Sequence, residues 1–338
     1  MNPQWRSFIE AAAGRFAADS SEVLDFGDAA AELQAAATQT VLVPLTHLAV
    51  LDAQGDDAKS FLHSQFTSDI NHLAETAVQH AGWCSAKGRM QASFLIWREA
   101  QGYRMTLAED LLAATQKRLQ MFVLRAKVKL TEASDICLLG LAGAQASAAL
   151  AAAALPCPEA PLTQASAEGV SVLRLDATRF MIAAPISQAE TLWAKLGTQA
   201  KPAGTAAWRW LDVQAAFPLV TLATKEEFVP QMADFEKIGG VSFHKGCYPG
   251  QEIVARTQYL GKVKRHLFRV NAEVAIKAGD VLHSPGNPDQ SVGMIMSAAP
   301  APTGGFAGLA VIQSNFADDV HLAALDGPTL QAFAVNPA

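Results

Sequence analysis

The apolar positions of this chain recur with two periods, which predict both helices and strands. Segments with an apolar residue every three or four positions predict helices. They are residues 7–18, 29–37, 56–71, 111–122, 144–155, 187–196 and 253–260. Short apolar or alternating runs predict strands, and one of them, residues 83–90, ends in a turn. They are residues 42–51, 83–90, 94–98, 104–107, 136–143, 170–175 and 180–183. The alanine-rich residues 29–37 also fit a loosely packed linker.

The last quarter of the chain has a different pattern. Short apolar strands follow one another there, separated by proline and glycine, at residues 267–270, 281–283, 292–298, 308–313 and 329–334. Such a series suggests a small antiparallel barrel. Together with the mixed pattern before it, the barrel predicts an α+β protein of two or three domains.

Composition narrows the class of protein. Half of the 338 residues are hydrophobic and 17% are charged, so the chain is globular, and its net charge of −6 argues against direct nucleic-acid binding over a broad surface. One basic cluster, residues 262–266, fits a solvated strand edge better than a contact with RNA or an acidic partner. No run reaches the ~18 apolar residues of a membrane span, and residues 7–18 do not resemble a signal peptide. We therefore expect a cytoplasmic protein without membrane contacts.

The cysteines give no framework for a disulfide or a metal. The four of them are scattered and none belongs to a C-x-x-C pair: Cys84, Cys137, Cys157 and Cys247. We therefore expect no zinc or iron–sulfur site within the chain.

One short run concentrates reactive groups. It combines an ammonium, a thiol, an amide, a carboxylate and two glycines: Lys245-Gly246-Cys247-Tyr248-Pro249-Gly250-Gln251-Glu252. Pro249 suits a first helical position because its φ is already helical and it lacks an N–H. Cys247 would then lie at or just before a helix N-terminus, close to Lys245. The helix dipole and the ammonium favour a thiolate, so the run predicts a reactive cysteine or an anion site.

The same run also fits a structural role. A lone cysteine before a helix is commonly a small buried apolar residue. Glu252 and Arg256 have the i,i+4 spacing of charge pairs on many solvated helices. Spacing alone leaves both interpretations open.

The run resembles the signature of the YgfZ family, folate-binding proteins related to the T-protein, the aminomethyltransferase of the glycine cleavage system. Every position of Lys-Gly-Cys-aromatic-x-Gly-Gln-Glu is met. Four more blocks are similar to the family in the same order: residues 65–70, 84–90, 208–218 and 228–232. The resemblance therefore extends over most of the chain.

The resemblance implies a three-domain, T-protein-like ring with a central folate pocket. Residues 25–135 and 200–262 would form a split N-terminal domain. Residues 136–199 would form a ferredoxin-like domain inserted into it, and residues 263–338 a C-terminal antiparallel β-barrel.

Tetrahydrofolate, the cofactor that the resemblance implies, needs a stacking surface, groups that read the pterin and cations for its anionic tail. Trp208 lies where the family carries a folate-contacting tryptophan. We expect this segment to be a strand, so Trp210 would share the face of Trp208, and one of the two would only pack. The family's second tryptophan is missing from residues 45–49, where His47 or Leu48 would replace it.

The other candidates come from the same blocks. Lys87, Arg89, Lys245 and Arg256 are cations for the tail or for a second substrate, although each alone fits a solvated surface. Asp69 fits a turn-forming residue as well as a carboxylate in the folate cavity. The folate-binding candidates are Trp208, Asp69, Lys87, Arg89, Gln231, Gln251, Glu252 and Arg256, and the catalytic candidates are Cys247 and Lys245.

T-proteins carry a catalytic aspartate after a Gly-Gly turn, but residues 87–94 contain no carboxylate. This argues against an aminomethyltransferase. The resemblance implies instead a tetrahydrofolate-dependent accessory protein that supports assembly or repair of iron–sulfur enzymes. Such a protein affects tRNA modification indirectly, with Cys247 as its functional thiol and those enzymes or their assembly factors as partners. The alternatives are a folate-dependent one-carbon transferase with an unknown acceptor and a cysteine-nucleophile hydrolase using His244 or His266 as base.

Overall fold

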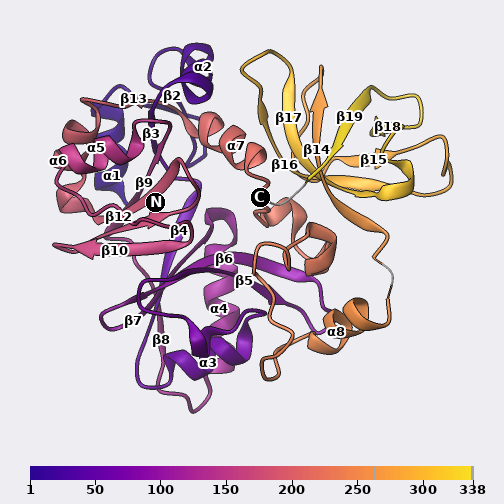
Figure 1. Cartoon of the computed structure of the whole chain (residues 1–338), viewed down its shortest axis with the longest axis horizontal. Coiled ribbons are helices and arrows are strands. Elements are labelled where there is room, and N and C mark those ends of the chain that lie inside the picture. Colours follow the sequence, from indigo (N-terminus) through magenta and orange to yellow (C-terminus); the bar gives the residue numbers. More distant parts are fainter. Residues whose placement is uncertain (262, 336–338) are drawn as a thin grey trace.

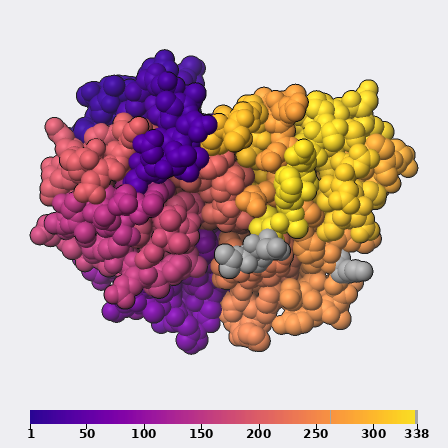
Figure 2. All heavy atoms as spheres, turned by 45° about the horizontal axis from the view of Figure 1, so that its top comes forward, coloured from indigo at the N-terminus to yellow at the C-terminus, as the bar shows by residue number. Residues whose placement is uncertain are grey.

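The structure is a computed structural model that describes residues 1–261 and 263–335. Three lobes surround a central helix and an irregular segment (Figure 1). Two lobes are built on open sheets, and the third is a barrel formed by the last part of the chain. Figure 2 shows the barrel, in yellow, as a lobe beside the N-terminal half of the chain.

The first lobe contains a six-stranded sheet with helices packed on it. Its strands, in spatial order, are β10 (Thr163–Ala167), β11 (Val170–Arg174), β12 (Arg179–Pro185), β9 (Ile136–Ala142), β3 (Val41–Pro44) and β13 (Lys201–Pro202). The helices of this lobe are α1 (Pro3–Ala11), α2 (Ala29–Thr38), α5 (Ala146–Ala152) and α6 (Ile186–Leu196). Strands β3 and β13 lie outside residues 136–199, so the sheet extends beyond the boundaries predicted for the inserted domain. A two-stranded ribbon, β1 (Arg15–Phe16) and β2 (Val23–Asp25), adjoins the lobe.

The second lobe contains an antiparallel five-stranded sheet. In spatial order its strands are β5 (Val78–Cys84), β6 (Met90–Glu99), β7 (Gly102–Ala108), β4 (Leu48–Gln54) and β8 (Lys129–Glu132). Helices α3 (Ala58–Gln65) and α4 (Leu112–Val123) pack on this sheet. Alternate side chains of β5 and β6 are buried in this core: Ala81 and Trp83, with Phe94 and Ala92 opposite them.

The third lobe confirms the predicted barrel. It closes in the order β14 (Arg265–Ala272), β17 (Phe306–Gln313), β16 (Gly293–Pro300), β15 (Val281–His283), β18 (Val320–Leu322) and β19 (Thr329–Ala334). The sequence pattern missed β18, although it predicted β15, which has the same length of three residues. The α+β class, with two sheet lobes and a C-terminal antiparallel barrel, is therefore confirmed.

The central elements connect the lobes. Helix α7 (Thr205–Gln214) packs against β16 and β17 of the barrel and against α2 and β3 of the first lobe. Residues 215–250 follow as loops and short 3-10 turns, and α8 (Gln251–Tyr259) then leads toward the barrel (Figure 1).

Several predicted elements were wrong in detail. Residues 42–51 form two strands of different sheets because the chain turns at residues 45–47. The helix predicted over residues 56–71 ends at Gln65, and the first helix begins at Pro3 rather than at residue 7. Residues 208–214 are helical rather than extended. Within the described ranges, we find no helix with the length and apolarity needed to cross a membrane.

Candidate functional site

The signature loop, residues 245–250, leads directly into α8. Gly250 caps this helix with a φ of +79°, and the first helical residue is Gln251. Pro249 is therefore not the first helical residue, and Cys247 lies three residues before the cap. The prediction that Cys247 adjoins the helix N-terminus was wrong because Gly250 turns the chain with left-handed backbone angles, which favour glycine.

Lys245 anchors the start of the signature loop. Its side chain is buried, and its Nζ donates to the backbone carbonyls of His63 and Phe66, which end α3. Its ammonium also lies 4.9 Å from the centre of the Tyr248 ring. Burial lowers the pKa of Lys245 to about 8, although the charges of Asp69 and Cys247 oppose this shift. The loop is thus fastened to α3 through a cation.

Cys247 is the exposed member of the anchored loop. Lys245 and Tyr248 on either side of it are buried, whereas Cys247 itself is exposed. Burial raises the pKa of Cys84 and of Cys137 to about 12, so neither is a nucleophile near neutral pH. The remaining cysteine, Cys157, is exposed. The structure therefore presents the Cys247 thiol to solvent and close enough to the Lys245 ammonium for their charges to interact.

Asp69 lies at the end of α3 near the same loop. Its carboxylate contacts His72 Nδ1 at 2.8 Å and His63 Nδ1 at 3.3 Å, and it accepts from the Asn71 N–H at 3.1 Å. Burial alone would raise the pKa of Asp69, but the hydrogen bond and charge of His72 and the charge of His63 hold it below its usual value. Asp69 therefore forms a turn, as one of the two interpretations predicted, and it also interacts electrostatically with Lys245.

The turn at residues 85–89 packs against the signature. Gly88 has a φ of +71°, and a Cβ there would clash with Ile253 of α8. A Cβ on Gly250 would in turn clash with the Ser85 carbonyl and the Gly88 backbone. Lys87 is exposed at this turn, and Arg89 donates to the carbonyl of Glu226 at 3.2 Å. The structure thus brings together two blocks that lie about 160 residues apart in the sequence.

The polar candidates around α8 have different environments. Gln231 is buried, and its Nε2 donates to the Val254 carbonyl at 2.8 Å. Gln251 donates to the Lys245 carbonyl at 3.4 Å, which places its amide under the signature loop. Glu252 and Arg256 are both exposed. Gln231 and Gln251 therefore hold the helix and the loop in place, whereas the two charged residues are accessible from solvent.

Trp208 is a core residue in this structure. Its side chain is only 1% exposed and packs with Leu45, and a Cβ on Gly140 would clash with its ring. The Arg179 guanidinium carbon lies 5.6 Å from the ring centre. The ring is therefore enclosed by the core in this structure, and its contact with folate stays a prediction. Trp210 is half-buried and packs against the apolar cores of both sheet lobes.

A buried polar cluster at the meeting point of the two sheets and α7 was missed by sequence reasoning. Arg179 of β12 donates to Asp212 of α7 at 2.5 Å, and the ring of His80 on β5 lies 5.3 Å from that of Phe217. Burial, together with the charge of Arg179, lowers the pKa of His80 to about 4. Burial also raises the pKa of Asp212 to about 6 despite the attraction of Arg179. No spacing in the sequence links these residues, since each comes from a different element.

His80 has an unused hydrogen-bonding atom in this cluster. Among the described residues, nothing accepts from or donates to its Nδ1, although the side chain is 8% exposed. Buried polar atoms are generally hydrogen-bonded, and an orphan one is a recognised sign of a ligand or water site. We call His80, Arg179, Asp212 and Phe217 the central cluster. It combines an aromatic ring, a carboxyl group and an imidazole, which are groups that suit a pterin.

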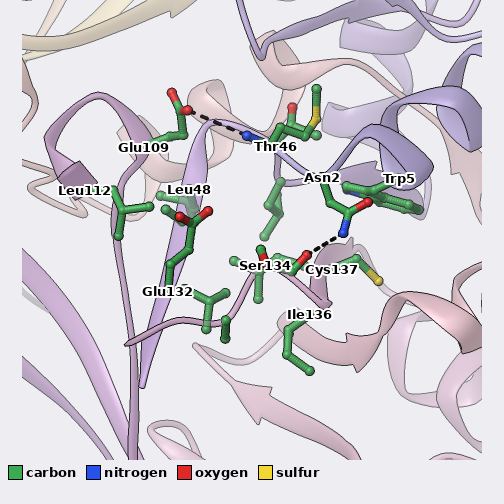
Figure 3. Close-up of a pocket in the computed structure, with 16 residues that line it drawn as sticks. Asn2, Trp5, Thr46, Leu48, Glu109, Leu112, Glu132, Ser134, Ile136 and Cys137 are labelled. Carbon is green, nitrogen blue, oxygen red and sulfur yellow. Dashed lines mark hydrogen bonds and ion pairs between the residues drawn. The ribbon is translucent and has the colours of Figure 1, made fainter. Parts of the chain in front are cut away.

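A small cavity lies where the family's second tryptophan is missing. It has a volume of about 60 Å³, and Leu48 is among the residues that line it (Figure 3). Asn2 closes part of it by donating to the Ser134 carbonyl at 2.8 Å. His47 is buried beside it, without hydrogen-bond partners for either ring nitrogen among the described residues, and burial lowers its pKa to about 3. Leu48 therefore borders a cavity, whereas His47 is a neutral core residue.

The fold is that of the aminomethyltransferases. The structure of aminomethyltransferase T of the glycine cleavage system from Bartonella henselae superimposes with a TM-score of 0.81. The superposition covers 100% of this chain and 97% of the other at 18% identity, which shows the fold alone. The GCVT N-terminal domain family also matches residues 11–239.

The sequence defines the family further. The chain is 33% identical to the tRNA-modifying protein YgfZ of Edwardsiella ictaluri over 282 residues, which are 82% of this chain and 85% of that protein. It is 32% identical to the protein of the same name from Yersinia pseudotuberculosis over 301 residues, 88% and 91% of the two chains. The chain belongs to the YgfZ family of GCVT-domain proteins.

Proposed function

We propose that this protein binds a reduced folate at its centre and acts in the cytoplasm as an accessory protein for iron–sulfur enzymes. Cys247 is its functional thiol. The observation that carries the proposal is the signature loop, which Lys245 and Tyr248 anchor while Cys247 stays exposed. A fixed, accessible thiol beside an ammonium suits exchange with a thiol or persulfide of a partner. The relatives named tRNA-modifying proteins support an effect on tRNA modification. In this proposal that effect passes through iron–sulfur enzymes.

The central cluster is the folate site in this proposal. Trp210 and Phe217 provide aromatic surface, and the orphan Nδ1 of His80 together with Asp212 provides the polar groups that read the pterin edge. The folate, when bound, would supply the one-carbon chemistry. The exposed cations Lys87 and Arg89 remain the proposed contacts of the anionic tail, and Arg256 remains a proposed contact of a second substrate.

Calorimetry with tetrahydrofolate tests the folate site. Wild type and Cys247→Ala should bind with equal affinity, because the thiol serves a partner rather than the pterin. His80→Phe should keep the packing against Phe217 but remove the polar Nδ1, and should weaken binding about tenfold, the loss of one hydrogen bond of ~1.4 kcal/mol. Undetectable binding to wild type, or an unchanged affinity of His80→Phe, would contradict this site.

Complementation tests the role of the thiol. Deletion of the gene should lower the activity of iron–sulfur enzymes, including those that thiolate tRNA, and wild type should restore it. Cys247→Ala should fail to do so although it folds and binds folate. Cys157→Ala, which removes the other exposed thiol, should restore it fully. Full rescue by Cys247→Ala would reject the thiol's role even if the folate site holds.

Aminomethyl transfer is the activity that this proposal excludes. Residues 87–94 contain no carboxylate, and the Ser93 hydroxyl accepts a hydrogen bond from the Val220 N–H at 2.9 Å. The segment therefore offers no group to handle the amine proton of the folate. The purified protein should form no methylenetetrahydrofolate from an aminomethyl-lipoyl carrier, and sustained turnover in that assay would favour the one-carbon transferase.

A further inference from the structure

A second cavity separates α8 from the first strand of the barrel. It has a volume of about 660 Å³, which lies within the range of small-molecule sites. Its lining includes the cations Arg256, Lys264 and Arg265 and the apolar residues Met232, Ile253 and Leu260. Its lining residues belong to α8 and to the start of the barrel, two elements that Figure 1 shows near each other, and none of them belongs to the central cluster. We call it the basic cavity.

Positive charge gathers on one side of the basic cavity. Arg256 comes from α8, whereas Lys264 and Arg265 lie at the start of β14. The described residues that line the cavity include no aspartate or glutamate. Arg265 donates instead to the Ser291 carbonyl at 3.2 Å, which leaves its charge uncompensated by a carboxylate of the lining.

The charges around Arg265 also indicate an excess of positive charge. Burial lowers the pKa of Arg265, and the charge of Arg89 lowers it further, whereas Glu227 acts in the opposite direction. Cations that repel one another at a half-buried site raise the free energy of the empty pocket. An anion that binds among them relieves this repulsion.

Apolar side chains make up another part of the lining of the basic cavity. Ile253 of α8 and Leu260, which directly follows α8, are 36% and 84% exposed, and Val229 and Met232 also line the cavity. The amide groups of Gln290 and Gln313 complete the wall. The cavity therefore suits a ligand with two parts, one multiply anionic and the other flat and apolar with polar edges.

We propose that the basic cavity binds a nucleotide unit. Its phosphates contact Arg256, Lys264 and Arg265, because guanidinium groups match phosphate oxygens in pairs. Its base packs against Met232, Ile253 and Leu260. Three cations balance most of the charge of a nucleoside di- or triphosphate, whereas a single carboxylate would leave them in excess. The unit is either a free nucleotide or a residue of an RNA chain, and the proposal does not depend on folate binding.

Calorimetry on the full chain with ATP, adenosine, inorganic tripolyphosphate and a short single-stranded RNA tests the proposal. ATP should bind more tightly than tripolyphosphate and than adenosine, because only ATP uses both sides of the cavity. Arg256→Gln and Arg265→Gln should each weaken ATP binding about tenfold. Arg118→Gln, which removes an exposed cation of α4 in another lobe, should leave it unchanged.

Further measurements distinguish the phosphate contacts from the base contacts, and a free nucleotide from an RNA chain. Leu260→Ala should weaken binding of ATP but not of tripolyphosphate. Tighter binding of the RNA than of ATP, lost in Arg265→Gln, would assign the unit to an RNA chain, whereas the reverse order would assign it to a free nucleotide. Failure of both to bind, or binding that Arg256→Gln and Arg265→Gln leave unchanged, would overturn the proposal. Equal affinities for ATP and tripolyphosphate would overturn the base contact.

Discussion

The ammonium of Lys245 donates to the backbone carbonyl of Phe66, a residue 179 positions earlier in the chain. This contact joins the signature loop to the segment that follows α3, which the family resemblance had identified as a separate block. Lys245 thus has a structural reason to precede the exposed Cys247: it holds the loop that carries the thiol. Removing the cation should therefore change the position of Cys247 as well as its electrostatic environment.

Alkylation should distinguish Cys247 from the other cysteines. Iodoacetamide should modify Cys247 faster than Cys157, although both are exposed, because only Cys247 has the Lys245 ammonium nearby. The buried Cys84 and Cys137 should react only when the protein unfolds. Mass spectrometry after timed labelling measures all four rates.

Lys245→Met supplies the control for this labelling. It should bring the rate of Cys247 close to that of Cys157, since the favourable charge is lost. A rate of Cys247 in wild type no greater than that of Cys157 would mean that the ammonium does not activate the thiol.

Contact between the signature and the turn at residues 85–89 should depend on Gly250. Gly250→Ala places a Cβ against the Ser85 carbonyl in addition to straining a positive φ. Gly239→Ala is a matched control, because its φ is +75° but nothing lies within 4 Å of the added Cβ. Gly239→Ala should cost about 1 kcal/mol of unfolding free energy, and Gly250→Ala should cost about 1–3 kcal/mol more. Urea unfolding compares them, and equal losses would show that the turn moves away freely.

The buried His47 should make the protein less stable in acid. Its folded-state pKa of about 3 is below the ordinary value of 6.5, so the unfolded chain binds the additional proton between these pH values. The free energy of unfolding should therefore decrease as the pH falls from 6.5 toward 3. His47→Leu should reduce this dependence, whereas His244→Gln, at an exposed position, should not. Identical pH profiles of wild type and His47→Leu, measured by denaturant unfolding, would contradict the assignment.

Sequence patterns predicted those parts of the fold that depend on neighbouring residues. The barrel strands and the hairpin of β6 and β7 follow from alternation, and the signature could be identified from eight consecutive residues. The segment with Trp208 and Trp210 was wrongly predicted to be a strand, because two large apolar residues spaced by two positions also fit a strand. In helix α7 the same spacing sends them to different faces, one into the core and the other toward the junction of two cores.

The central cluster could not be predicted because its members meet only through tertiary structure. His80, Arg179 and Asp212 come from β5, β12 and α7, and each alone is an ordinary polar residue. The role of Gly140 becomes visible only when the position of α7 is known, because its lack of a side chain makes room for the ring of Trp208. Likewise, the basic cavity needs both α8 and β14 in position before Arg256 and Arg265 share a surface.

The last prediction separates packing from ligand contact in α7. Trp208→Ala should lower the unfolding free energy by about 3–5 kcal/mol, as expected when a large buried ring is removed. Trp210→Ala should leave most of that stability but weaken tetrahydrofolate binding about tenfold, because stacking on an aromatic ring contributes on the order of 1 kcal/mol beyond buried area. Trp208→Phe keeps an aromatic ring in the core and is the informative control. If Trp208→Phe folds normally yet loses folate affinity while Trp210→Ala retains it, then Trp208 is the stacking residue that the family resemblance implied, and its ring must become accessible when folate binds.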